Sequence, residues 1–196
     1  MTTPPPADPF ALFADWFSEA AASEPSDPNA MSLATAAADA RPSVRIVLCK
    51  HFDARGFVFY SNSESRKGNE LATNPHVYLN FHWKTLKRQV RVEGTAAPVG
   101  PSEADAYFAS RPRDSQLGAW ASDQSRPMRD RESFERRMVA FAAKFDGRPV
   151  PRPPHWIGWR VTPVQLEFWQ DRPNRLHDRL TYTRVGDGWT TRLLYP

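Results

Sequence analysis

Apolar residues at helical spacing open the chain. Phe10, Phe13 and Phe17 recur at intervals of three and four positions, which places them on one face of an α-helix. The preceding Asp8 is a good N-cap, so we expect an amphipathic helix over about 9–23. By the same reasoning three further helices are expected, at 65–74, 102–108 and 130–145, the last being the longest.

Between these helices the pattern changes to that of β-strands. Short runs rich in β-branched and aromatic residues are separated by turn-forming Asp, Gly and Pro residues. The runs with strand character are 31–36, 43–53, 56–61, 76–83, 87–99, 155–161, 164–170, 179–185 and 189–195. The first three predict an antiparallel meander, and a Gly-Asp-Gly turn predicts a hairpin between the last two. We expect about seven or eight strands, with helices between them, in an α+β barrel-like fold.

The chain has the length of one domain. Its 196 residues contain no internal repeat and no domain-scale linker, which predicts a single domain over 8–196 after a Pro-rich, disordered tail, 1–7. The single cysteine, Cys49, excludes an internal disulfide and suits a reducing compartment. The sequence has no apolar run of roughly 20 residues and no signal-peptide pattern at its start. We therefore expect a cytoplasmic protein with no membrane partner.

A small basic excess narrows the class of partner. The chain has 26 Lys and Arg against 22 Asp and Glu, a net charge of +4, which favours anionic ligands. These basic residues are scattered through the strands, which suits small phosphate sites better than nucleic acid. The sequence has no glycine-rich nucleotide loop, no metal-ligand spacing among its five histidines and no nucleophile elbow. An organic cofactor is therefore the expected source of the chemistry, with no metal.

Two segments place cations where an anion could bind. Arg45 and Lys50 bracket four apolar residues of one strand. Arg66 and Lys67 follow Ser65 at a helix N-terminus, where free backbone N–H groups and the helix dipole favour an anion. The alternative for each cation, which is favoured when each is taken singly, is a solvated strand end or part of a helix cap.

A third segment, 107–120, is denser in polar donors. Tyr107, Arg111 and Ser115 stand at i, i+4 and i+8, so one helical face would present a phenol, a guanidinium and a hydroxyl to a phosphate. Pro112 interrupts a continuous helix and favours two short ones. The alternative is an ordinary polar helix face.

A fourth segment, 168–179, combines aromatic and basic side chains. An indole lies close in sequence to guanidinium groups and an imidazole, a set that could stack on a planar heterocycle and hydrogen-bond to its edges. The alternative is a charged hairpin loop.

Together these motifs resemble those of the pyridoxamine 5′-phosphate oxidase family. The motifs RIVLCK, FYSNSESRKGNEL, NFHWKTLKRQVRVEG, YFASRPRDSQLGAWASDQS and EFWQDRPNRLHDR follow the family's order and approximate spacing. The resemblance covers the chain from about Pro6 to Pro196. The sequence departs from the family in lacking its frequent, longer N-terminal arm, and in having Cys49 where an aliphatic residue is usual.

The resemblance implies a split β-barrel homodimer with two FMN sites across the subunit interface. The residues that match FMN contacts are Arg45, Ile46, Val47, Leu48, Cys49, Lys50, Tyr60, Ser61, Arg66, Lys67, Gln89, Gln124, Ser125, Trp169 and Arg179. The residues that match substrate contacts are Lys50, Tyr107, Arg111, Ser115, Arg175, Leu176 and His177. Of these, Arg175 and His177 are implied to face the pyridine ring and form the candidate catalytic pair.

The implied reaction is the oxidation of pyridoxamine or pyridoxine 5′-phosphate to pyridoxal 5′-phosphate. O2 accepts the electrons and gives H2O2, and the amine also releases ammonia. Three alternatives stay open: a related flavin oxidase of the phenazine pathway acting on larger carboxylated rings, a non-catalytic flavin or pyridoxal-phosphate carrier, and a nucleic-acid-binding module. The phosphate set around Arg111 argues against the first, and the pair Arg175 and His177 argues against the second.

Overall fold

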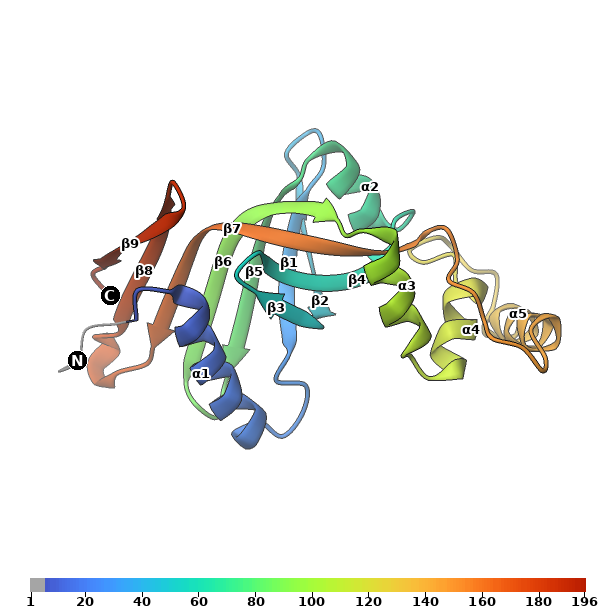
Figure 1. Ribbon diagram of the computed structural model, residues 1–196, viewed down its shortest axis with the longest axis horizontal. Helices are drawn as coiled ribbons and strands as arrows, with labels where there is room; N and C mark the ends of the chain where they lie inside the picture. The colour runs from blue at the N-terminus through green and yellow to red at the C-terminus, as the bar shows by residue number, and fades with distance from the viewer. Residues whose placement is uncertain (1–5) are drawn as a thin grey trace.

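Figure 1 shows the computed structural model of the chain, in which residues 6–196 are described. These residues form five α-helices, a short 3-10 helix and one nine-stranded antiparallel sheet. The helices are α1 (Pro9–Ser23), α2 (Arg66–Thr73), α3 (Pro101–Ala109), α4 (Arg113–Ala121), α5 (Arg131–Lys144) and η1 (Pro173–Arg175). The strands are β1 (Ala30–Ala36), β2 (Pro42–Leu48), β3 (His51–Asp53), β4 (Gly56–Asn62), β5 (His76–Trp83), β6 (Arg88–Pro98), β7 (Trp156–Gln170), β8 (Asp178–Val185) and β9 (Gly188–Leu193).

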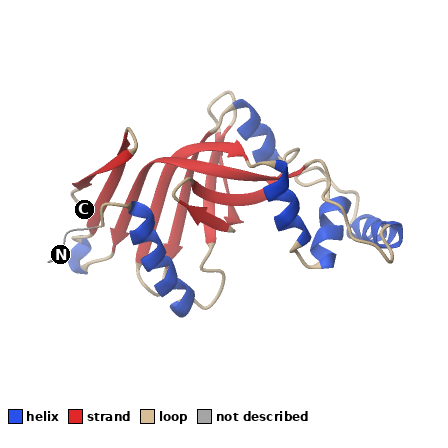
Figure 2. Ribbon diagram, in the orientation of Figure 1, coloured by secondary structure: helices blue, strands red, loops and turns tan. Residues whose placement is uncertain are grey.

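The sheet curls into an open barrel with helices at its ends (Figure 2). Its main strand order is β2-β1-β5-β6-β7-β4-β3, and β8 and β9 continue from β7. Strand β7 pairs with β6 along its length, with β4 over its first half and with β8 over its second half. One strand therefore connects the two ends of the molecule.

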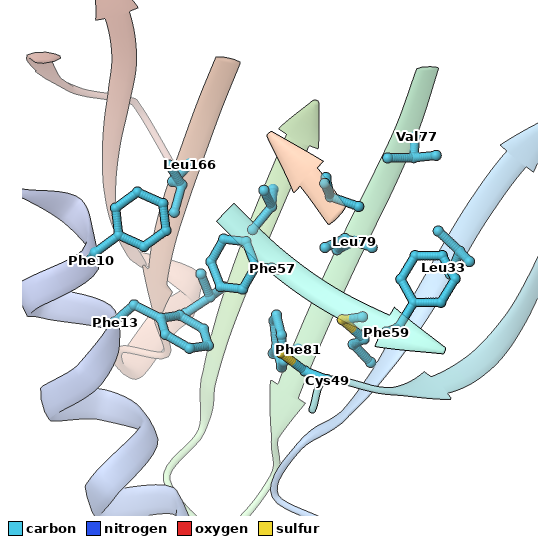
Figure 3. Close-up of a cluster of buried hydrophobic side chains, with 14 of the residues drawn as sticks. Phe10, Phe13, Leu33, Cys49, Phe57, Phe59, Val77, Leu79, Phe81 and Leu166 are labelled. Carbon is cyan, nitrogen blue, oxygen red and sulfur yellow. The ribbon is translucent and has the colours of Figure 1, made fainter. Parts of the chain in front are cut away.

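The predicted helix over 9–23 is confirmed, and its buried face fills the barrel. The Asp8 carboxylate accepts a hydrogen bond from the Phe10 backbone N–H at 3.0 Å and so caps α1. The ring centroid of Phe13 lies 4.9 Å from that of Phe57 and 5.0 Å from that of Phe81, both edge to face (Figure 3). Each such pair adds about 0.5–1.5 kcal/mol beyond burial of area. At 15 residues α1 is longer than α5, which has 14, contrary to the predicted order.

The predicted meander over residues 31–61 is confirmed in its two antiparallel pairings but is wrong in its single middle strand. The run 43–53 forms two strands because the chain leaves β2 at Cys49 and Lys50 before it enters β3. Strand β2 pairs with β1, whereas β3 pairs with β4 at the opposite end of the strand order. The turn between them brings β2 and β4 to either side of one space, which matters for the site below.

The predicted break between 155–161 and 164–170 is also wrong. Strand β7 is continuous through Pro163, and its register against β6 shifts between Glu93 and Gly94. Val164 is left unpaired at this bulge, because Glu93 pairs with Gln165 and Gly94 pairs with Pro163. A side chain is excluded opposite it, since a Cβ on Gly94 would lie 2.4 Å from the carbonyl oxygen of Thr162.

The start of the described chain is tied to the sheet. The Tyr182 hydroxyl donates a hydrogen bond to the Pro6 carbonyl at 2.9 Å. Residues 1–5, which make up most of the tail expected to be disordered, lie outside the described residues. Within residues 6–196, every helix is too short or too polar to cross a membrane.

Candidate functional site

A cavity of about 600 Å³ opens between β2, β4, α2 and the α3–α4 pair. Among the described residues its lining holds no carboxylate, and it holds five cationic side chains. These are Arg45, Lys50, Arg66, Lys67 and Arg111. Such an unbalanced lining attracts anions, and the low dielectric of the protein walls strengthens the attraction.

The N-terminus of α2 forms one wall of this cavity. The Ser65 hydroxyl accepts a hydrogen bond from the Gly68 backbone N–H at 3.3 Å, so the predicted cap is confirmed. Gly68 permits a close approach, because a Cβ there would lie 2.1 Å from the Ser63 carbonyl oxygen. The first-turn residues Arg66 and Lys67 are therefore held beside the cavity, where the helix dipole favours a negative charge.

Lys67 is a buried cation in this wall. Its ammonium donates to the Ser65 hydroxyl at 3.1 Å and to the Gln124 side-chain oxygen at 3.0 Å. Burial, and then the charge of Arg45, lower the pKa of Lys67 to about 8. Among residues 6–196 no carboxylate forms an ion pair with it, so its charge is available to a bound anion.

Arg45 and Arg66 share a single carboxylate, that of Glu70. The Arg66 Nε lies 2.9 Å from one Glu70 oxygen, and an Arg45 terminal nitrogen lies 3.3 Å from the other. Glu70 is buried and does not line the cavity, whereas both arginines do. The carboxylate thus lies behind the two cations.

Aromatic rings line a second wall. The ring centroid of Tyr60 lies 4.1 Å from that of Tyr107 and 5.1 Å from that of Trp156, with all three rings nearly parallel. The absence of a side chain at Gly158 makes room for this stack, because a Cβ there would lie 2.6 Å from the Tyr60 ring. Burial first, and then nearby Glu103, raise the pKa of Tyr60 to about 12, so its phenol stays a neutral donor.

Arg111 lies between this aromatic wall and an adjoining cavity of about 360 Å³ that also contains Ser115. Its guanidinium carbon lies 4.8 Å from the centre of the Trp156 ring. Within the described part of the chain, the buried Arg111 Nη1 atom has no hydrogen-bond partner. A buried donor left unpaired costs about 1–3 kcal/mol, which a ligand oxygen would offset.

Most of the expected site residues meet around these two cavities, and we call them the cavity cluster. They are Arg45, Ile46, Val47, Leu48, Lys50, Tyr60, Ser61, Arg66, Lys67, Tyr107, Arg111, Ser115, Gln124 and Ser125. Helices α3 and α4 are separate, as Pro112 predicts. Cys49 does not line either cavity, since its side chain is buried and its sulfur donates to the His51 carbonyl at 3.4 Å.

The remaining expected residues form a second group, the loop cluster. They are Gln89, Trp169, Arg175, Leu176, His177 and Arg179. Gln89, Trp169 and Arg179 stand side by side on β6, β7 and β8, and the His177 ring lies 4.5 Å from that of Trp169. Figure 1 shows this end of β7 and β8 at one end of the molecule and α3 and α4 at the other. Within one chain the two clusters do not meet.

The loop cluster is largely balanced in charge. Arg179 donates to both carboxylate oxygens of the buried Glu167, at 2.7 Å and 3.1 Å. The His177 Nδ1 atom lies 3.0 Å from an Asp171 oxygen, which fixes the orientation of the imidazole. Arg175 differs, because it is exposed and its backbone has a φ of 62°. A non-glycine residue in this conformation is strained, and such strain clusters at functional sites.

Three residues that shape these clusters were not predicted from the sequence: Trp156, Glu70 and Glu167. The i, i+4 spacing of Arg66 and Glu70 is a signal that could have identified Glu70. Trp156 and Glu167 lie on β7, where the sequence shows only a strand.

Family models match nearly the whole chain. The model described as pyridoxamine 5′-phosphate oxidase matches residues 17–145, and the model described as pyridoxine 5′-phosphate oxidase C-terminal dimerisation region matches residues 156–196. The chain belongs to the pyridoxamine 5′-phosphate oxidase family. The sequence-based resemblance to this family is therefore confirmed.

Curated members of this oxidase family are similar over their full length. The pyridoxine/pyridoxamine 5′-phosphate oxidase of Sphingopyxis alaskensis is 61% identical, over 100% of this chain and 91% of its own. The protein of the same name from Gluconobacter oxydans is 62% identical, over 97% of this chain and 95% of its own.

Two solved structures share the fold of this chain. PhzG from Burkholderia lata, in complex with tetrahydrophenazine-1-carboxylic acid, has a TM-score of 0.92 and 35% identity, covering 98% of this chain and 94% of its own. A pyridoxamine 5′-phosphate oxidase-related, FMN-binding protein from Nostoc punctiforme has a TM-score of 0.76 and 16% identity, covering 95% and 96%. The predicted α+β split barrel is therefore confirmed.

Proposed function

We propose that this protein is an FMN-dependent oxidase that converts pyridoxamine 5′-phosphate and pyridoxine 5′-phosphate to pyridoxal 5′-phosphate. O2 accepts the electrons and H2O2 is formed, with ammonia as a further product of the amine. The observation that carries the proposal is a cavity with five cationic side chains and no carboxylate in its lining within residues 6–196. A cofactor and a substrate that each bear a phosphate would place two dianions there.

The cofactor phosphate is assigned to the wall formed by α2. Arg45, Arg66 and Lys67 supply charge, and the hydroxyl of Ser61 and the amide of Gln124 lie beside them at hydrogen-bonding distances. Donors of this kind, at a helix N-terminus, fit a terminal phosphate. The chain offers no second phosphate cradle of the strand-glycine-helix type used for dinucleotides, which favours FMN over FAD.

The substrate phosphate is assigned to Lys50, Tyr107, Arg111 and Ser115. Arg111 supports this assignment best, because its buried and unpaired Nη1 atom needs an oxygen acceptor. Tyr107 lines the larger cavity and Ser115 lines the adjoining one, and Arg111 lines both. Burial lowers the pKa of Arg111, but a guanidinium keeps its proton under all working conditions.

The loop cluster is assigned to the same site, contributed by the partner subunit of a homodimer. Gln89, Trp169 and Arg179 would contact the cofactor, and Arg175, Leu176 and His177 would contact the substrate. The separation of the two clusters within one chain supports this arrangement (Figure 1). Light scattering at micromolar concentration should then give about twice the chain mass of 22.3 kDa. A monomer that binds FMN tightly would contradict it.

When bound, FMN supplies the two-electron acceptor and the route to O2. The chain's own residues supply position and charge. Lys50 and Arg111 would anchor the substrate phosphate, and Arg175 would lie against the pyridine ring and stabilise charge that develops on it. The His177 Nδ1 atom lies 3.0 Å from an Asp171 oxygen and 3.3 Å from the Arg172 backbone nitrogen, and these contacts would leave Nε2 to contact the substrate.

The phenazine-type relative defines the competing substrate class. PhzG is 35% identical to this chain, against 61% for the Sphingopyxis alaskensis oxidase. A carboxylated tricyclic ring would also need one anion site besides that of the cofactor phosphate. Its carboxylate carries one negative charge, whereas the phosphate of the proposed substrate is a dianion. The four-residue phosphate set with Arg111 favours the phosphorylated pyridine.

The test is to identify the bound flavin and then to reduce it with substrate. The protein is reconstituted, denatured, and the released flavin identified by chromatography, where FMN is expected. Anaerobic addition of pyridoxine 5′-phosphate should bleach the flavin absorbance, whereas pyridoxine without the phosphate should not at the same concentration. Release of FAD, absence of flavin after reconstitution, or bleaching only by a carboxylated phenazine precursor would overturn the proposal.

A further inference from the structure

The buried Glu70 stands apart from the rest of the site, because it touches the proposed cofactor-binding arginines without lining the cavity. Its side chain is 6% exposed. One oxygen accepts from Arg66 Nε at 2.9 Å, and the other accepts from the Ser43 hydroxyl at 2.6 Å and from the Thr35 hydroxyl. These partners come from α2, β2 and β1, so three elements converge on one carboxylate.

Arg45 is held by the same group of atoms. One of its terminal nitrogens donates to the Leu33 carbonyl at 3.2 Å and to Thr35, and the other donates to Ser43 and lies 3.3 Å from Glu70. The two hydroxyls accept from the guanidinium and donate to the carboxylate. The direction of the Arg45 fork therefore depends on Glu70 both directly and through Thr35 and Ser43.

The network keeps Glu70 ionised. Burial raises the pKa of Glu70. Hydrogen bonds from Ser43, Thr35 and Arg66, together with the charge of Arg45, outweigh this effect and lower the pKa to about 2. The carboxylate is thus a fixed negative charge throughout the neutral range. Three cations, Arg45, Arg66 and Lys67, and this one carboxylate leave two net positive charges facing the cavity, which match a phosphate dianion.

We propose that Glu70 is a positioning residue that holds Arg45 and Arg66 in the geometry that recognises the phosphate of the flavin. This inference rests on the proposed function and assigns a role to a residue that does not itself touch the cofactor. The proposed role and the charge of Glu70 predict opposite effects of its removal on the affinity for FMN. Removing a negative charge near an anion site should strengthen binding by Coulomb attraction, whereas losing the alignment of two arginines should weaken it.

The experiment compares two flavins that differ by the phosphate. The apoproteins of the wild type and of Glu70→Gln are titrated with FMN and with riboflavin, and binding is followed by quenching of flavin fluorescence. We expect the Kd for FMN to rise by about tenfold or more in Glu70→Gln, because charge-assisted contacts to the phosphate are lost. The Kd for riboflavin should be unchanged. The matched control is Glu135→Gln, an exposed residue paired with Arg131 on α5, which should change neither value.

Each other outcome has a definite meaning. An equal loss of both flavins would assign Glu70 a structural role only, and tighter FMN binding would show that its charge dominates; either result overturns the inference. If the wild type itself does not prefer FMN to riboflavin, the proposed function falls instead.

A second variant guards against a Glu70→Gln chain that fails to fold. Thr35→Val keeps the shape of a buried side chain and removes one of the two hydroxyls that link Arg45 to Glu70. The preference for FMN over riboflavin should fall in the same direction by about threefold, as expected for one neutral link in the network. A full wild-type preference in Thr35→Val would overturn the inference.

Discussion

The cavity cluster and the loop cluster treat charge in opposite ways. In the cavity cluster, Lys67 and Arg111 have no ion-pair partner among residues 6–196, and Arg111 has an unpaired buried nitrogen as well. In the loop cluster, Arg179 is bound through both carboxylate oxygens of Glu167, and His177 lies against Asp171. The cavity cluster therefore offers unpaired cations to a ligand, whereas in the loop cluster Arg179 shares the carboxylate of Glu167 with Arg91.

This difference indicates a division of work. The free-energy cost of burying an unpaired cation is offset only when an anion binds beside it, so the cavity cluster is suited to binding phosphates. Neutralised and oriented groups contribute little to affinity but hold a fixed geometry, so the loop cluster is suited to placing a ring. Arg175 is the exception, since it is exposed and strained and forms an ion pair with no carboxylate among residues 6–196.

The largest effect is expected from Arg175→Ala. If Arg175 stabilises charge that develops on the reacting ring, kcat should fall by about 100- to 1,000-fold, with FMN content unchanged. Steady-state kinetics with pyridoxine 5′-phosphate and the flavin absorbance measure both. Arg172→Ala is the control, because Arg172 lies in the same loop but is paired with Asp178 at 2.6 Å. An unchanged kcat/KM in Arg175→Ala would contradict the catalytic role proposed for the loop cluster.

Arg111→Ala should act mainly on KM. Loss of a charge-assisted contact to the substrate phosphate predicts a KM higher by about 10- to 150-fold, with FMN content again unchanged. The measurement is the same pair of assays, with Arg131→Ala on the exposed face of α5 as the control. A variant that loses its FMN would show that Arg111 belongs to the cofactor half of the cavity cluster.

Mixing these two variants tests whether the clusters meet between subunits. A heterodimer of Arg111→Ala and Arg175→Ala chains would hold one doubly altered site and one intact site. After unfolding and refolding an equimolar mixture, activity at low substrate should recover to about one quarter of the wild-type value, since half of the dimers are mixed. Activity no higher than the mean of the two parent variants would place both clusters of a site in one chain.

The smallest effect concerns pH and FMN affinity. The pKa of Lys67 is about 8 in the free protein, and a bound phosphate dianion would raise it, so binding takes up a proton. Affinity for FMN should therefore weaken as the pH rises above about 8, by up to about tenfold per unit. Titrations of the apoprotein from pH 7 to 9 measure this, and Lys67→Met should flatten the profile. A wild-type profile as flat as that of Lys67→Met would contradict the role of Lys67.

Local patterns predicted the elements of the fold well. Helix α1 follows from Phe10 and Phe13 at helical spacing, and the start of α2 follows from its Ser65 cap. Pairing of strands was less accessible. The local pattern does not show that β2 and β3 separate, because each pairs with a different strand. Pro163 predicts a break, although β7 continues through it beside a bulge.

The candidate site was predicted unevenly for a physical reason. Cations near Arg66 and Arg111 stand out in sequence because they interrupt apolar patterns. Glu70 is marked only by its i, i+4 spacing from Arg66, and Trp156 is one of many aromatic residues in the strand-like runs. The separation of the loop cluster from the cavity cluster is a property of the folded chain and leaves no mark in the order of the motifs.

Strand β7 has a consequence for the spacing of sites. Trp156 at its first position lines the larger cavity, and Trp169 near its end belongs to the loop cluster. At about 3.3 Å per residue, the strand between them spans roughly 40 Å, longer than any single flavin. In the proposed dimer each copy of β7 would reach from one flavin to the other. The distance between the two flavins is then set by the length of one covalent strand, so an insertion in β7 would shift both active centres at once.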